Sequence, residues 1–116
     1  MTVNAMIADL ESEQDSLDQI VADLESSRWL LATESPTWTI ADQISHLQFF
    51  DERAALALSD PEAFVLDRKR IIAAAHHDSS VDLGRQVSAA ELLQAWRNSR
   101  RSLIHAVSIV DPTVRV

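Results

Sequence analysis

The stretch TWTIADQISHLQFFD, residues 37–51, predicts an amphipathic helix and contains the first candidate site residue. Thr39 is a favourable N-cap and Asp42, three residues later, forms a partial capping box with it, so the helix is predicted to begin just after Thr39. Asp51 lies in the centre of its apolar stripe and His46 on the flank, where a simple core would use leucine. The stripe itself consists of Ile40, Ile44, Leu47, Ala54 and Leu58.

An earlier helix precedes this stretch. Apolar residues recur from Val3 at spacings of four and three, which predicts a helix ending near Ser27 or Trp29. Ser35-Pro36 then marks a break, because a residue before proline avoids helical geometry.

The sequence after residue 51 predicts a further long helix behind an extended connection. Asp60-Pro61 ends the second helix near Ser59, and residues 64–75 are compatible with a short helix. Ser88 and Glu91 form a full capping box that opens a third long helix reaching about Val110. A connection of this length predicts a crossover that leaves the second and third long helices parallel. We therefore expect one all-α helical-bundle domain over residues 1–116.

Composition excludes several functional classes. The 116 residues carry a formal net charge of −8, which disfavours nucleic acids and anionic membranes as partners, since both need clustered Lys and Arg. No cysteine is present, so any metal site would use histidine and carboxylate ligands. No signal-peptide pattern or run of membrane-spanning length occurs, so a cytoplasmic location is expected.

Polar residues inside the apolar seams need partners. Arg100 interrupts the seam of the third long helix as Asp51 interrupts that of the second, so an Asp51–Arg100 ion pair is the economical prediction. The alternative is that Asp51 accepts a hydrogen bond from a tryptophan indole. For both residues a structural role is favoured over a catalytic one.

The histidines can be compared in the same way. A lone histidine such as His46 is more often a hydrogen-bonded core or boundary residue than a metal ligand. His76 and His77 are adjacent, so on a helix they would point about 100° apart and could not chelate one ion; placement near a helix C-terminus suits them better. His105 lies opposite the apolar seam and is expected on the solvated surface.

The motif W-T-[IV]-x-[DH]-Q-[IL]-x-H-L, with an aspartate five residues after the histidine, resembles the N-terminal metal-binding domain of mycothiol-dependent maleylpyruvate isomerases and their actinobacterial relatives, in the DinB-like superfamily. The resemblance extends along most of the chain. It rests on Trp38, Thr39, Ile40, Gln43, Ile44, His46, Leu47 and Asp51.

The resemblance implies a DinB-like four-helix bundle, ordered up-down-down-up, with a crossover after the second helix. It also implies a divalent metal, Zn or Ni, held by His46 together with a Glu-x3-His pair from the fourth helix, and mycothiol as the thiol cofactor. The sequence stops at Val116, before that pair. We therefore expect the fourth helix and two of the three ligands to be missing, and the chain to be incomplete or inactive by itself.

Three amphipathic helices without a fourth would leave an apolar groove, so a homodimer that covers it is expected. Two functions follow from these observations. One is part of a metal-binding, thiol-dependent transferase or isomerase. The other is a non-catalytic helical dimerisation or binding module in which His46 is structural.

Overall fold

The computed structural model describes residues 2–35, 37–74 and 77–109, and this part of the chain is helical throughout apart from its loops and one isolated bridge between Ala32 and Thr39. The all-α prediction is therefore confirmed. The long helices are α1 (Val3–Ala22), α2 (Ile40–Ser59) and α5 (Ala89–Ser108), and the shorter elements are η1 (Ser26–Leu30), α3 (Pro61–Ala73), η2 (Ser79–Val81) and α4 (Asp82–Gln86).

Local capping determines where the helices begin. The Thr39 side chain accepts from the backbone N–H of Asp42, whose carboxylate accepts from the N–H of Thr39, so the predicted capping box of α2 is complete. Ser88 and Glu91 form the same arrangement at α5. Asp60 caps α3, and a proline at the first helical position fits because its missing N–H would have no partner there.

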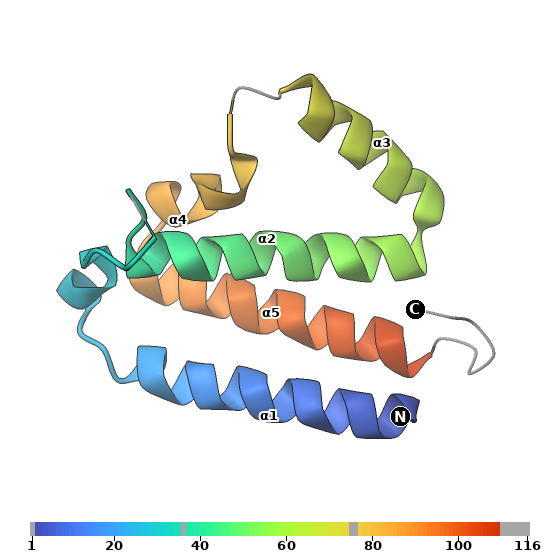
Figure 1. The fold of residues 1–116 in the computed structure, drawn as a ribbon, viewed down its shortest axis with the longest axis horizontal. Helices are drawn as coiled ribbons and strands as arrows, with labels where there is room; N and C mark the ends of the chain where they lie inside the picture. The colour runs from blue at the N-terminus through green and yellow to red at the C-terminus, as the bar shows by residue number, and fades with distance from the viewer. Residues whose placement is uncertain (1, 36, 75–76, 110–116) are drawn as a thin grey trace.

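The three long helices form a layer with α5 between α2 and α1 (Figure 1). Gln48 of α2 donates to Ser99 of α5 at 3.1 Å. Nearer the start of both helices, Ser45 of α2 and Leu92 of α5 both lie against Gly84. Residue numbers therefore rise together, and the predicted parallel pair is confirmed. α1 and α5 are antiparallel, because Asp18 of α1 pairs with Arg97 of α5, and the earlier residue Gln14 pairs with the later residue Arg100.

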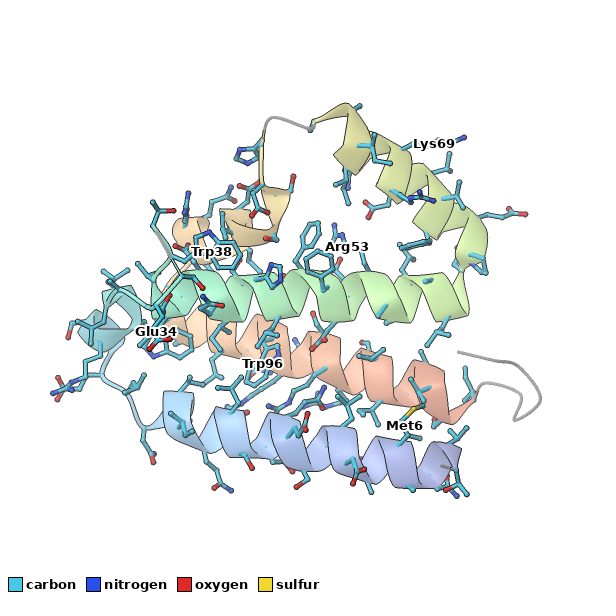
Figure 2. All side chains as sticks on the ribbon, in the orientation of Figure 1. Met6, Glu34, Trp38, Arg53, Lys69 and Trp96 are labelled. Carbon is cyan, nitrogen blue, oxygen red and sulfur yellow. The ribbon has the colours of Figure 1, made fainter. Side chains whose placement is uncertain are left out.

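The hydrophobic core lies where α5 meets both neighbours and the loop that follows α1. Leu92 and Trp96 of α5 are 0% and 1% exposed, and Figure 2 shows Trp96 inside the bundle. The cluster is completed by Val21, Trp29, Ala41 and Ile44. α5 buries a wide face because it has a helix on each side.

Two boundaries differ from the predictions. α1 ends at Ala22, before the predicted Ser27 or Trp29, and a 3₁₀ turn then brings Trp29 into the core. The crossover contains α4 and η2 in addition to α3, which begins earlier than predicted because Asp60 and Pro61 open it. The predicted position of His76 lies outside the described residues.

Gly84, the single glycine of the chain, permits the closest approach between the crossover and α2. A Cβ built there would lie 2.8 Å from the Ser45 Cβ and 3.0 Å from the Ala41 carbonyl oxygen. The Gly84 N–H also donates to Ser45 Oγ at 3.1 Å. Packing at this position therefore requires a residue that has no Cβ.

We expect Gly84→Ala to lower the free energy of unfolding by about 1–3 kcal/mol, because the added methyl group must displace α4 from backbone as well as side-chain atoms. Urea denaturation followed by circular dichroism measures this loss. Ala90→Ser, on the exposed part of α5, serves as a control and should change stability by less than about 0.5 kcal/mol. A Gly84→Ala protein as stable as the wild type would show that α4 does not pack this closely.

Candidate functional site

The loop before α2 places the first side chain of the candidate site, Trp38. Thr33 N–H and Thr33 Oγ1 both donate to the Trp38 carbonyl, at 2.9 and 3.0 Å, and Ile40 N–H donates to Leu31 at 3.0 Å. Thr37 adopts a φ of 67°, which is strained for a β-branched residue. The loop is thus folded back on itself, and Trp38 lies on the side of α2 that faces α4 (Figure 2).

Two polar residues of the motif have structural roles. Gln43 Nε2 donates to Thr33 Oγ1 at 3.3 Å and so ties the loop to α2. Asp42, besides capping α2, accepts from Arg85 Nε of α4 at 3.1 Å. Burial raises the pKa of Asp42, but the hydrogen bonds from Arg85 and Thr39 outweigh it and hold that pKa below its usual value. The motif therefore connects three segments around the first turns of α2.

His46 lies half-buried on α2 between two aromatic rings. Its ring centroid is 5.1 Å from that of Trp38 and 4.6 Å from that of Phe50. Its Nδ1 is 3.0 Å from Ser80 Oγ in η2. No residue in the described part of the chain forms a hydrogen bond with the other ring nitrogen, Nε2.

Ser80 and Asp78 from the crossover complete the surroundings of His46. Ser80 Oγ lies 2.6 Å from Asp78 Oδ1, and the Ser80 N–H donates to the same oxygen at 3.0 Å. The hydrogen bond from the Ser80 hydroxyl lowers the pKa of Asp78; burial opposes this, and the charges of His46 and His77 add to the lowering. Sequence analysis missed both residues, because the crossover has no periodic pattern that would have placed them against α2.

The predicted Asp51–Arg100 ion pair is wrong. Arg100 turns to α1, where Nη2 lies 2.8 Å from Asp18 Oδ2, and its guanidinium also stacks on the Trp96 ring at 4.6 Å. Burial is the largest effect on Asp51 and raises its pKa, while the Trp96 indole and the more distant Arg100 charge lower it. The lowering of this pKa by the Trp96 indole agrees with the alternative that the sequence offered for Asp51.

The remaining described histidines do not join His46. His77 lies just after the C-terminus of α3, where its N–H donates to the carbonyl of the C-cap residue Ala74 at 2.9 Å, and its Nε2 lies 2.6 Å from Asp82 Oδ1. His105 is exposed as predicted. Within residues 2–35, 37–74 and 77–109, no group of three or more His, Asp or Glu side chains could hold a metal ion. His46 is thus a single candidate ligand in the described part of the chain.

An apolar cavity of about 370 Å³ lies between α2 and α3, adjoining His46 through Phe50. At the wall of this cavity, Arg53 Nε lies 3.1 Å from Asp67 Oδ2 of α3. Figure 2 shows Arg53 on the side of α2 that faces α3. Its size and lining suit the apolar part of a small ligand. The apolar lining consists of Phe49, Phe50, Ala54, Ala57, Phe64 and Ile71.

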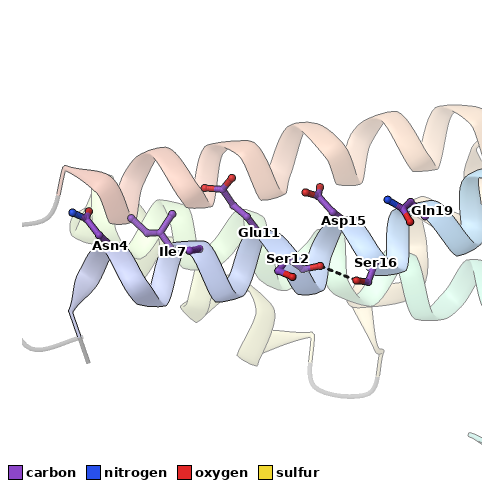
Figure 3. Close-up of a pocket in the computed structure, with 8 residues that line it drawn as sticks. Asn4, Ile7, Glu11, Ser12, Asp15, Ser16 and Gln19 are labelled. Atoms are coloured by element: carbon purple, nitrogen blue, oxygen red, sulfur yellow. Dashed lines mark hydrogen bonds between the residues drawn. The ribbon is translucent and has the colours of Figure 1, made fainter.

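A second concavity runs along α1, where Glu11, Asp15 and Gln19 are among the side chains that line it (Figure 3). All of its lining residues belong to α1, and it carries no histidine. It shares no residue with the surroundings of His46, so we do not assign it a function.

Among the described residues, no helix combines the length and the apolar composition needed to cross a bilayer. The expected cytoplasmic location, the homodimer, the divalent metal and mycothiol stay predictions.

Comparison with known proteins finds the same family that the motif around His46 resembles. Residues 10–116 match the family model described as the mycothiol maleylpyruvate isomerase N-terminal domain. Two similar relatives are uncharacterised proteins of Mycobacterium tuberculosis, from strains CDC 1551 and H37Rv; each is 41% identical over 103 residues, covering 84% of this chain and 38% of the relative. The chain therefore spans 38% of the length of these relatives. No solved structure matches it.

Proposed function

The chain belongs to the mycothiol maleylpyruvate isomerase N-terminal domain family, and we propose that it is the His46-bearing part of a divalent-metal, thiol-dependent transferase or isomerase. The observation that carries the proposal is the half-buried imidazole of His46 at the motif position. One nitrogen of this ring is engaged by Ser80, and the other has no hydrogen-bond partner in the described part of the chain.

The donor atom suits a metal, but the described donor set is incomplete. Neutral imidazole is a common ligand of Zn²⁺ and Ni²⁺, whereas catalytic zinc sites usually have three protein ligands. His46 is one such ligand, and the described residues add no second or third. We propose that the others lie outside these residues, which is consistent with relatives much longer than this chain.

When bound, a divalent metal would lower the pKa of a coordinated thiol and hold it as a thiolate, which is how a cysteine-free chain could take part in mycothiol chemistry. Around that site, the residues of this chain would orient the imidazole and bind the substrate. Trp38 and Phe50 flank the imidazole and limit the orientations that its ring can take. The cavity between α2 and α3 is our proposed place for the apolar part of a substrate.

We expect the chain to bind Zn²⁺ weakly through His46, because one imidazole supplies one ligand. In a zinc titration followed by nuclear magnetic resonance, the His46 ring resonances should shift saturably, and the His46→Gln variant should lose this binding. His105→Gln is the matched control, because His105 is exposed on α5 and is not among the side chains around His46. A wild-type protein whose His46 resonances do not respond to zinc would contradict the proposal.

The alternative is a non-catalytic helical module in which His46 is structural and two copies associate. It is favoured by the packing of His46 between aromatic rings and by exposed apolar residues such as Phe50, which is 51% exposed. In that case zinc leaves His46 unaffected, and light scattering gives the mass of a dimer at micromolar concentration.

A further inference from the structure

Ser80 is buried, 3% exposed, and its hydroxyl lies between two titratable side chains. Oγ is 2.6 Å from Asp78 Oδ1 and 3.0 Å from His46 Nδ1. A hydroxyl group has a single proton to donate and can accept with its lone pairs. Only one of these two contacts can therefore use the Ser80 proton.

The acceptor of that proton follows from the chemistry of Asp78. The hydrogen bond from Ser80 lowers the pKa of the Asp78 carboxyl below its usual value, so the group is ionised near neutral pH. An ionised carboxylate has no proton and can only accept. The short contact between Ser80 and Asp78 therefore uses the Ser80 proton, and the contact with His46 must use a proton on Nδ1.

We propose that Ser80 and Asp78 are positioning residues that hold neutral His46 as its Nδ1–H tautomer and leave the Nε2 lone pair free. The role of this lone pair as a metal ligand rests on the proposed function, whereas the tautomer itself does not. Histidines that ligate metals commonly donate their other ring N–H in this way, which fixes the ring and increases the basicity of the ligating nitrogen.

The Ser80 hydroxyl is well placed for this role because its backbone is fixed to α2. Ser45, 0% exposed, donates from Oγ to the Ser80 carbonyl at 2.8 Å and accepts from the Gly84 N–H. Trp38 and Phe50 flank the imidazole. The hydrogen-bonded chain from Asp78 through Ser80 to His46 thus joins two elements that are 34 residues apart in sequence at the Ser80–His46 contact.

The tautomer can be measured directly by nuclear magnetic resonance on the chain labelled with ¹⁵N-histidine, at a pH where the imidazole is neutral. His46→Gln assigns the His46 signals. We expect the wild type to show a protonated Nδ1 and an unprotonated Nε2. Ser80→Ala should shift the population toward Nε2–H, because Nδ1 loses its acceptor.

Asp78→Asn provides an independent variant, because Asp78 is exposed and its replacement leaves Ser80 in place. A neutral amide is a weaker acceptor, so the Ser80 proton can turn to Nδ1 and the Nε2–H population should rise. Ser99→Ala is the matched control: Ser99 is also buried and accepts from Gln48 at 3.1 Å, but it does not contact His46. In Ser99→Ala, the tautomer populations of His46 should equal those of the wild type.

Zinc as the probe separates the two proposals. If His46 is a ligand, Ser80→Ala should weaken zinc binding at His46 by about 10-fold or more, and Ser99→Ala should not. A wild-type His46 in the Nε2–H form, or one whose tautomer is unchanged in both Ser80→Ala and Asp78→Asn, would overturn the inference whatever zinc does. A wild-type Nδ1–H tautomer without zinc binding would support the inference and contradict the proposed function.

Discussion

Trp96→Ala is expected to lower the free energy of unfolding by about 3–5 kcal/mol, the largest effect of any single substitution considered for this chain. Trp96 is 1% exposed and belongs to the core cluster that also contains Leu92 and Ile44. Its indole also contacts Asp51 and lies under the Arg100 guanidinium, whose carbon is 4.6 Å from the ring centroid. Alanine would leave a cavity and remove both polar contacts.

Small domains are stable by only about 5–15 kcal/mol, so this variant should unfold at a clearly lower urea concentration or be partly unfolded without urea. Far-ultraviolet circular dichroism is the suitable probe, since the substitution removes a fluorophore. Leu30→Ala is the control, because Leu30 is 70% exposed and its loss should cost less than about 0.5 kcal/mol. A loss for Trp96→Ala below that of Leu30→Ala would show that α5 is not the centre of the core.

Asp18→Ala should have the second largest effect, about 3 kcal/mol, because it leaves Arg97 without its carboxylate and Arg100 with only the more distant, exposed Asp15. Asp18 accepts from Arg97 Nε and Nη2 at 2.8 and 2.7 Å, and Arg100 Nη2 lies 2.8 Å away. The value is at the lower end of the range for buried ion pairs, because the Arg97 side chain is 35% exposed. Denaturation of Asp18→Ala, Arg100→Ala and the double variant measures the coupling, and the double variant should lose less than the sum.

Asp15→Ala is the matched control for this network. Asp15 is also on α1 and 3.6 Å from Arg100, but its side chain is 67% exposed, so its removal should cost less than about 1 kcal/mol. Strictly additive losses in the Asp18–Arg100 cycle would show that the two residues are not coupled.

The same network should depend on pH. The hydrogen bond from Arg97 lowers the pKa of Asp18; burial opposes this, and the charges of Arg100 and Arg97 add to the lowering. A group whose folded-state pKa is lowered stabilises the fold above its unfolded-state pKa, and this stabilisation disappears as the pH falls through the folded-state value. The stability difference between wild type and Asp18→Ala should therefore be full near pH 7 and shrink below about pH 4.

The chain sequence determined the three long helices and the starting points of α2 and α5. Thr39 with Asp42 and Ser88 with Glu91 are local capping signals, and both boxes form as predicted. The length of the connection between α2 and α5 was enough to predict that they run parallel. The motif around His46 was sufficient to recognise the family. These features depend on residues close together in the chain, or on the spacing between elements.

Only the tertiary structure decided which polar residues meet. A helical wheel places Arg100 on the buried face of α5, but α5 has a neighbour on each side, and periodicity cannot tell α1 from α2. Arg100 therefore pairs with Asp18 and stacks on Trp96, while Asp51 is left with the indole. The contact of His46 with Ser80 likewise depends on how closely α4 approaches α2, which the absence of a side chain at Gly84 makes possible. Such contacts join residues far apart in the chain, so packing determines them and local sequence does not.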